Sequence, residues 1–276
     1  MAEARPHPRL QPGEEDFPYD RDSVLTSKYH MDARKPVDRL LRYERVLDTQ
    51  AQWPALDFAD RRGLEIGCGP LLGWGPIAVY LGARRYVCIE PRFQEAVLLA
   101  DEVWTRFFLP LHQQLEAVFA RGVSFADFAD RIRSRIHVHG VPVERCELDD
   151  ASADLVISNG VLQHVADLDG AMQQIRRVSC EGAKQLHVVH FTDHVSPPDD
   201  PFHEIYRQEP ADYFAHDSLL NLKRPSEVAA MFHGVGISVT MVPYLVDPPS
   251  RPRTLAPYWR RFDPSDLAIQ IAFFVT

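Results

Sequence analysis

Short apolar segments alternate with helical segments along most of this 276-residue chain, and this alternation constrains the fold more than any other feature. Five segments predict buried strands, at residues 62–66, 85–90, 135–140, 153–160 and 184–191. Strands that alternate with helices favour a mostly parallel sheet with helices on both faces. Two further strands are predicted at 237–246 and 266–276. Because a single loop joins them, we expect an antiparallel strand at or near one edge of the sheet.

The helical pattern predicts one domain with two insertions. Apolar residues at three- and four-residue spacing predict helices at residues 30–50, 75–83, 168–178 and 226–236. Residues 91–134, after the second strand, keep this spacing over a length that suits two or three helices. Residues 192–226, after the fifth strand, are polar, interrupted by proline and lid-like. We therefore predict a flexible arm at residues 1–22 and a single domain at residues 23–276.

Composition excludes several classes of protein. The formal net charge of −9 argues against a general nucleic-acid surface. The chain has no apolar run of about 18 residues, so we expect no membrane insertion, and its first residues lack the apolar core of a signal peptide. The four cysteines form no CxxC pair, which favours buried free thiols and a cytoplasmic location.

A glycine-rich loop follows the first predicted strand in the run LEIGCGPLLGWGP, residues 64–76. A phosphate-binding P-loop requires a lysine that this run lacks. A dinucleotide fingerprint fits Gly67 and Gly69 but meets Leu72 at its third glycine position. Glycines tolerate unusual backbone angles and let the main chain approach a ligand closely. The loop therefore indicates a ligand at the carboxyl end of the strands.

The run LEIGCGP closely resembles the first motif of class I S-adenosylmethionine-dependent methyltransferases. Glu90 ends the second strand about 25 residues after Glu65, where the family carries an acid that accepts the ribose hydroxyls. The run ADLVISNGVLQHVADLDGAMQQIRRV, which begins at Ala153, resembles the fourth-strand segment of the same family. The resemblance implies a Rossmann-like, seven-stranded α/β fold and S-adenosylmethionine as cofactor, with S-adenosylhomocysteine as product.

The resemblance also implies a set of cofactor contacts. Glu65 is expected to meet the methionine ammonium group, directly or through water, and Val141 lies where the family binds adenine. Many relatives have an aspartate there, so backbone carbonyls or Glu144 are the alternatives in this chain. The remaining cofactor residues are expected to be Gly67, Cys68, Gly69, Pro70, Glu90, Pro91, Asn159, Gly160, His164 and Tyr29.

Histidines cluster at the end of the fifth strand in the run HVVHFTDH, which begins at His187. We predict His194 or His190 as a general base oriented by Asp193, with a rate that falls below a pKa of roughly 6 to 7. The alternatives are a structural core histidine and a metal site that adds His203 and Glu204. Two histidines three residues apart on a strand face opposite ways, which argues against one ion, and we expect no metal.

Residues 193–236 resemble a branch of bacterial methyltransferases, many of which are encoded with glycan or secondary-metabolite pathways. This resemblance implies a small-molecule, sugar or lipid-linked acceptor. The predicted acceptor-binding residues are His164, Tyr206, Tyr213, Asn221 and Arg224. We expect methyl transfer to oxygen or nitrogen in biosynthesis. Carbon methylation and a catalytically silent cofactor-binding protein stay open, as does a homodimer formed through residues 91–134.

Overall fold

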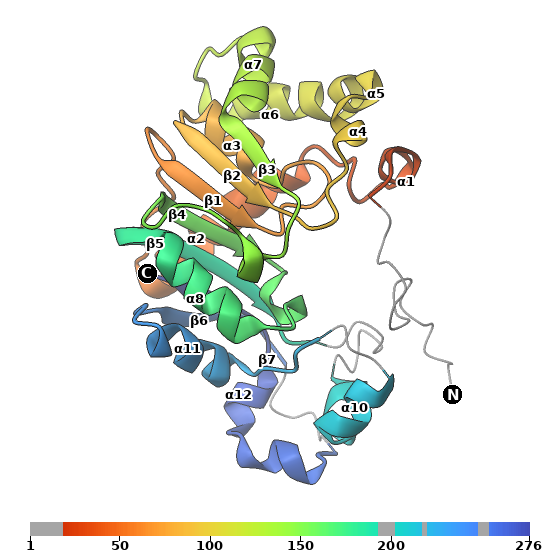
Figure 1. The fold of residues 1–276 in the computed structure, drawn as a ribbon, viewed down its shortest axis with the longest axis vertical. Coiled ribbons are helices and arrows are strands. Elements are labelled where there is room, and N and C mark those ends of the chain that lie inside the picture. Colours follow the sequence, from red (N-terminus) through yellow and green to blue (C-terminus); the bar gives the residue numbers. More distant parts are fainter. Residues whose placement is uncertain (1–18, 193–201, 217–219, 248–253) are drawn as a thin grey trace.

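The computed structural model describes residues 19–192, 202–216, 220–247 and 254–276 (Figure 1). A twisted sheet runs through the centre of these residues. Its strands are β1 (Arg62–Ile66), β2 (Arg85–Ile89), β3 (Ile136–His139), β4 (Ala153–Asn159), β5 (Ser179–His190), β6 (Thr240–Val246) and β7 (Ile269–Val275). All seven predicted strands are therefore present, and the largest shift is at β5, which begins at Ser179 instead of residue 184.

The strand order is β3-β2-β1-β4-β5-β7-β6. Strands β1 to β5 pair in parallel, whereas β7 is antiparallel to both of its neighbours, β5 and β6. The chain crosses over after β3 to place β4 beside β1, so the carboxyl ends of β1 and β4 flank the point where the strand order reverses. The predicted fold class is confirmed, and the antiparallel strand lies one position in from the edge.

Helices cover both faces of the sheet (Figure 1). The α-helices are α1 (Arg21–Thr26), α2 (Lys35–Ala51), α3 (Gly75–Tyr80), α4 (Glu95–Leu98), α5 (Asp101–Val103), α6 (Leu109–Phe119), α7 (Phe125–Arg135), α8 (Leu168–Val178), α9 (His203–Arg207), α10 (Pro210–His216), α11 (Pro225–Gly234) and α12 (Pro264–Ala268). Shorter turns are the π-helix η1 (Trp104–Phe108) and the 3₁₀ helices η2 (Val143–Arg145), η3 (Leu162–His164) and η4 (Pro257–Arg261).

Two hydrophobic clusters fill the space between the sheet and its helices. One cluster joins a face of the sheet, through side chains such as Ile157 and Phe273, to α2, α3 and the helices of the insertion. The other joins the opposite face, through Val156 and Phe274, to α8, α11 and η4. Neighbouring residues of β4 and β7 enter opposite clusters because successive side chains of a strand point to opposite faces.

The insertion after β2 contains three helical stretches, as its sequence pattern predicts: α4, an unbroken stretch from α5 through η1 to α6, and α7. Within the unbroken stretch, from Asp101 to Phe119, the hydrogen bonding changes from α to π over Trp104–Phe108 and then back to α. Pro110 lies in the first turn of α6, directly after the π-helix. Proline has no N–H to donate to an earlier turn, so the hydrogen-bond register of the helix changes there.

The amino-terminal boundary also differs from the prediction. Helix α1 begins at Arg21, within the segment 1–22 that we predicted as a flexible arm. The side chain of Asp20 accepts a hydrogen bond from the backbone N–H of Ser23 at 3.0 Å, as an N-cap does. Residues 1–18 lie outside the described residues. No helix of the described ranges is long and apolar enough to cross a bilayer.

The packing of α8 gives the first prediction. Ile175 is fully buried between this helix and the sheet. Its replacement in Ile175→Ala should lower the free energy of unfolding by about 2–5 kcal/mol, because a cavity remains after truncation. The matched control is Leu99→Ala, at a side chain that is 74% exposed, and it should change stability by less than about 0.5 kcal/mol. Urea denaturation measures both, and similar losses in the two variants would contradict the assigned core.

Candidate active site

The carboxyl ends of four neighbouring strands bring the predicted site residues to one edge of the sheet. Gly67 follows β1, Glu90 follows β2, Asn159 ends β4 and His190 ends β5. Backbone hydrogen bonds tie these ends together, from Gly67 N to Ile89 O at 2.7 Å and from Gly160 N to Val188 O at 2.8 Å. The strand order therefore assembles residues that are more than 120 positions apart in the sequence.

Glu65 lies beneath the glycine loop and holds its shape. Its carboxylate is buried, and Oε2 accepts hydrogen bonds from the Trp74 backbone N–H at 2.8 Å and from the Tyr86 hydroxyl at 2.9 Å. A Cβ on Gly73 would overlap this carboxylate, so glycine is required there. Burial raises the pKa of Glu65 to about 7. We predicted that Glu65 meets the methionine ammonium group of the cofactor. Its carboxylate instead turns inward and binds the loop.

The two glycines of the GCG run have different surroundings. Gly67 has a φ of +72°, and a Cβ on it would overlap the side chain of Val161. Gly69 has a φ of +68°, and the nearest atom to its Cβ position is the Tyr19 hydroxyl at 3.8 Å. Gly67 is therefore required by packing within the protein, and its predicted contact with the cofactor stays a prediction. Gly69 has the open side and leaves space above the loop.

Glu90 links the glycine loop to the end of β2. Its side chain is 5% exposed. Oε2 accepts a hydrogen bond from Gly69 N at 3.0 Å, and Oε1 accepts one from Arg92 N at 3.2 Å. Of the other predicted loop residues, Cys68 and Pro70 are buried and Pro91 is exposed. The carboxylate of Glu90 therefore lies beside Gly69 of the glycine loop.

Tyr19 and His30, from the amino-terminal part of the chain, form an aromatic and cationic cluster with Arg92 beside Glu90 and Gly69. The Tyr19 ring packs edge-on against His30, with 5.9 Å between centroids, and the Arg92 guanidinium lies 4.5 Å from the Tyr19 ring centroid. Burial, together with the charges of Lys35 and Arg92, lowers the pKa of His30 to about 4. Sequence reasoning missed Tyr19 and Arg92, because only the tertiary fold brings Tyr19, which precedes α1, next to the end of β2.

Tyr29, predicted as a cofactor contact, is 57% exposed and lies between two cations of α2. Its hydroxyl accepts a hydrogen bond from Arg39 Nη2 at 3.2 Å, and Lys35 Nζ lies 3.3 Å from the ring centroid. One helical turn further along α2, the Tyr43 hydroxyl donates to Oδ1 of Asn159 at 3.3 Å. Helix α2 therefore reaches the carboxyl end of β4.

His190 lies next to Gly160 at the ends of β5 and β4. A Cβ on Gly160 would lie 3.6 Å from Nε2 of His190. Burial, together with the positive charge of Arg39 and with His164, lowers the pKa of His190 to about 4. The ring is therefore neutral at neutral pH, and the expected titration near 6 to 7 does not apply to it. Asp193 and His194 lie outside the described residues.

Residues 121–187 match the protein family described as "Methyltransferase domain", which is about a quarter of the chain. This match and the order of the seven strands fit the α/β fold of class I methyltransferases. A solved S-adenosylmethionine-dependent methyltransferase from Mesorhizobium loti is similar at 13% identity and a TM-score of 0.48, over 83% of this chain and 98% of that one. No curated protein sequence matches the chain.

Two further solved structures are similar at comparable levels. A S-adenosylmethionine-dependent methyltransferase from Aquifex aeolicus has 10% identity and a TM-score of 0.46, over 93% of this chain and 98% of that one. Phosphoethanolamine N-methyltransferase 2 from Haemonchus contortus has 15% identity and a TM-score of 0.45, over 83% of this chain and 46% of that one. Likenesses at these identities carry no information on the acceptor of this methyltransferase.

Most of the predicted acceptor residues are buried inside the protein. Tyr206 is 2% exposed and its hydroxyl donates to Leu267 O at 2.8 Å, while Tyr213 is 3% exposed. Arg224 is 1% exposed and donates to the backbone carbonyls of Phe191 at 3.0 Å and Ile269 at 3.2 Å. We therefore withdraw Tyr206, Tyr213 and Arg224 from the acceptor site, since burial keeps them from a ligand.

Asn221 positions the turn that carries His164. Its Nδ2 donates to Leu162 O at 2.7 Å and to Val165 O at 3.1 Å. These two carbonyls flank His164, which is half-buried in η3 at the carboxyl end of β4. Asn221 is thus a positioning residue, contrary to its predicted role as a direct acceptor contact, whereas His164 stays at the edge of the site.

His187 is a structural histidine of the core. It is fully buried, with Nδ1 2.9 Å from the Ser158 hydroxyl and Nε2 3.0 Å from Oε1 of Gln185. Its ring packs against Phe232 of α11, 4.9 Å between centroids, on the side of the sheet away from His190. Among the described residues, no group of three His, Cys, Asp or Glu side chains is placed to hold a metal ion.

Val141 follows β3 and precedes η2, and its half-buried side chain offers no hydrogen-bond acceptor. The adenine position at Val141 or Glu144 stays a prediction.

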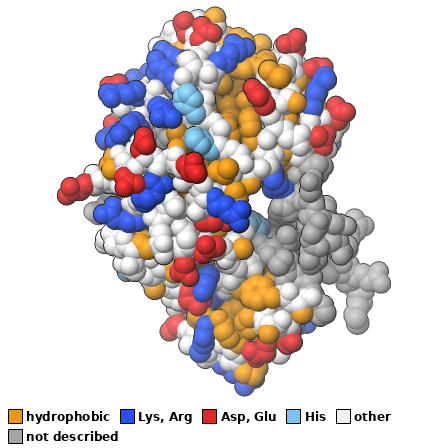
Figure 2. All heavy atoms as spheres, in the orientation of Figure 1, with side chains coloured by type: hydrophobic (Ala, Val, Ile, Leu, Met, Phe, Trp, Pro, Cys, Tyr) orange, Lys and Arg blue, Asp and Glu red, His pale blue; other side chains and the backbone are white. Residues whose placement is uncertain are grey.

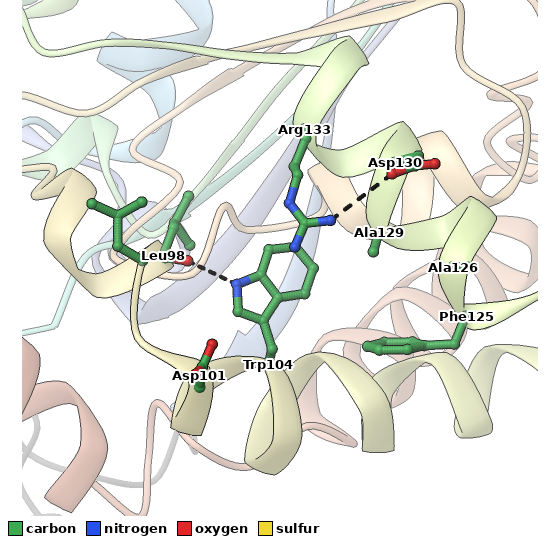
Figure 3. A pocket seen from close by; sticks show the side chains of 9 residues that line it. Leu98, Asp101, Trp104, Phe125, Ala126, Ala129, Asp130 and Arg133 are labelled. Atoms are coloured by element: carbon green, nitrogen blue, oxygen red, sulfur yellow. Dashed lines mark hydrogen bonds and ion pairs between the residues drawn. The ribbon is translucent and has the colours of Figure 1, made fainter.

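A separate hollow of about 470 Å³ lies in the insertion, away from the strand ends, between Trp104, Phe125 and Arg133 (Figure 3). Hydrophobic side chains gather over this part of the molecule (Figure 2). The Arg133 guanidinium covers the Trp104 ring at 4.2 Å.

The buried position of Glu65 predicts a dependence of stability on pH. Between about pH 4.5 and 7 the folded protein keeps a proton that the unfolded chain releases. The free energy of unfolding should therefore fall as pH rises through this window, by about 3 kcal/mol from this group. Glu65→Gln retains an oxygen for Trp74 and Tyr86 and should lack this decline. Urea denaturation from pH 5 to 8 measures it, with exposed Glu181→Gln as control; an unchanged slope in Glu65→Gln would refute the assignment.

Proposed function

We propose that this methyltransferase binds S-adenosylmethionine above the glycine loop and transfers its methyl group to an oxygen or nitrogen of a small molecule. The observation that carries the proposal is the pairing of the open side of Gly69 with the buried carboxylate of Glu90 at the reversal of strand order. An open backbone beside a carboxylate fits a ribose diol, which donates two hydrogen bonds.

The sulfonium of the cofactor supplies an activated methyl group, which a nucleophile takes as the carbon–sulfur bond breaks. The chain has to align that nucleophile at about 3 Å and receive its proton where one is lost. Asn159, Gly160, His164 and His190 surround the carboxyl ends of β4 and β5. Among them, His190 is the neutral imidazole nearest the end of β5 and is the proposed proton acceptor, with His194 and Asp193 as untested partners.

The lowered pKa of His190 narrows the acceptor chemistry. An imidazole with a pKa of about 4 is a weak base, and the efficiency of general-base catalysis falls as the base weakens. We therefore propose an acceptor group that loses its proton easily or has none to lose, and expect alignment to supply most of the acceleration. A sugar, lipid-linked or secondary metabolite in biosynthesis fits this proposal.

The four free thiols fit a reducing compartment such as the cytoplasm.

Glu90 provides the test of cofactor binding. Loss of two charge-assisted hydrogen bonds in Glu90→Ala should weaken binding of S-adenosylhomocysteine by about 2–4 kcal/mol, or roughly 30- to 1,000-fold. Titration calorimetry should show that the variant no longer distinguishes this ligand from its 2′-deoxy analogue, whereas the parent does. The control is Glu95→Ala, an exposed acid on α4. A variant that keeps the parent's discrimination would place the ribose elsewhere.

His190 provides the test of the chemical step. Because a weak base assists little, His190→Asn should lower turnover by no more than about 10²-fold, the low end of general-base assistance, while affinity for S-adenosylhomocysteine stays near the parent value. The parent rate should stay level as pH falls and decline only near pH 4, because the histidine is neutral above its pKa. The acceptor is first identified by mass spectrometry of a metabolite mixture. Exposed His233→Asn is the control, and full turnover in His190→Asn would leave catalysis to alignment alone.

A further inference from the structure

The hollow in the insertion has apolar walls that come from three separate helices. Leu98 of α4, Trp104 of η1 and Phe125 of α7 line it (Figure 3). It lies on the face of the molecule where hydrophobic side chains gather (Figure 2). Apolar surface that is gathered in one place marks a site of contact with a partner or a ligand. The proposed reaction at the strand ends does not use this hollow, so its occupant is a separate question.

The floor of the hollow is held in place by contacts within the protein. Trp104 Nε1 donates to Leu98 O at 2.7 Å, and the Arg133 guanidinium lies 4.2 Å from the Trp104 ring centroid. Trp104 also begins the π-helix η1, a form of helix that is rare and is found frequently at functional sites. A surface whose side chains are already ordered loses little conformational freedom when a partner binds.

An exposed leucine stands at the rim of the hollow. The side chain of Leu99 is 74% exposed, which makes it the most exposed large hydrophobic side chain of the described residues. It follows α4 directly and belongs to the lining of the hollow. A projecting apolar side chain and an apolar hollow on the same surface complement each other across a two-fold axis, because such an interface brings the same patch of two copies together.

The charges around the hollow also suit a second copy of this chain. Asp101, Asp130 and Arg133 line it, so both signs are present on one patch. Within one chain Arg133 lies 3.9 Å from Asp130, in a pair whose side chains are 59% and 80% exposed, and a pair so exposed contributes little. A patch of one sign would repel its own copy, whereas this mixed patch allows the arginine of each copy to face the acids of the other.

We propose that two copies of this chain associate through the hollow in the insertion, with Leu99 of each copy seated in the hollow of the other. The association leaves the carboxyl ends of the strands open and does not depend on the proposed function. Because the patch covers only part of the insertion, the dimer is weak, with a dissociation constant of about 1–100 μM. Protein diluted below this range for urea denaturation is monomeric, so Leu99→Ala keeps its place there as a control for the core.

Sedimentation velocity over a concentration series that spans this range tests the interface. The parent should shift from monomer to dimer as its concentration rises. Leu99→Asp should raise the dissociation constant by at least about 10-fold, because a charge buried in an apolar hollow is costly. The matched control is Leu245→Asp, at a side chain of β6 that is 45% exposed, and it should dimerise as the parent does. Urea denaturation of the diluted proteins checks that both variants are folded.

Two charge variants test whether the arginine and the acids face each other between copies. Arg133→Glu leaves only acids around the hollow, and Asp130→Lys leaves an excess of positive charge. Each variant alone should dimerise less than the parent, because like charges then meet at the interface. An equal mixture of the two should recover dimers. The pair within one chain cannot produce this recovery, since neither variant contains it.

The remaining outcomes decide against the proposal. A parent that stays monomeric at the highest concentration would overturn it and leave the hollow to a small molecule or an unlike protein. A parent dimer that Leu99→Asp does not weaken, or that both leucine variants weaken equally, would place the interface elsewhere. A mixture of the charge variants that sediments as the separate variants do would show that the arginine and the acids do not meet across the interface, which overturns the two-fold arrangement.

Discussion

The carboxylate of Glu65 fixes the glycine loop on which the proposed site depends. A loop of this kind exposes its backbone to a ligand and has few side chains of its own to hold it. Glu65 supplies the support from below through the Trp74 N–H and the Tyr86 hydroxyl, and Gly73 leaves space for the carboxylate. A buried carboxylate is costly unless it is well hydrogen-bonded or protonated. Burial raises the pKa of Glu65 to about 7, and the hydrogen bonds from Trp74 and Tyr86 oppose that rise.

Above that support, residues from distant parts of the chain surround one edge of the sheet. Glu90 joins the loop to β2, Tyr43 joins α2 to β4, and Asn221 holds the turn that carries His164. Arg224 has a related role on the other side, where its guanidinium binds the ends of β5 and β7 through their carbonyls. Asn221 and Arg224, which the sequence analysis predicted as acceptor contacts, thus position the strand ends and turns around the site.

The electrostatic environment of the site follows from this burial. His30 and His190 both have pKa values of about 4, because desolvation and nearby cations oppose a further positive charge. A site that keeps its imidazoles neutral can accept a proton only weakly, and it places its fixed positive charge on Arg39, Lys35 and Arg92. This distribution suits a reaction that depends on orientation of the reacting groups, as displacement at an activated methyl group does.

The sequence by itself determined the seven strands, their α/β arrangement and the edge at which Gly67, Glu90, Asn159 and His190 meet. Those inferences rest on local hydrophobic periodicity and on motif spacing, which neighbouring residues along the chain encode. Only the tertiary structure decided that Glu65 turns inward, that Arg224 and Tyr206 are buried and that Tyr43 of α2 contacts the end of β4. The direction and burial of a polar side chain depend on elements that pack against it from far along the chain, so no local pattern specifies them.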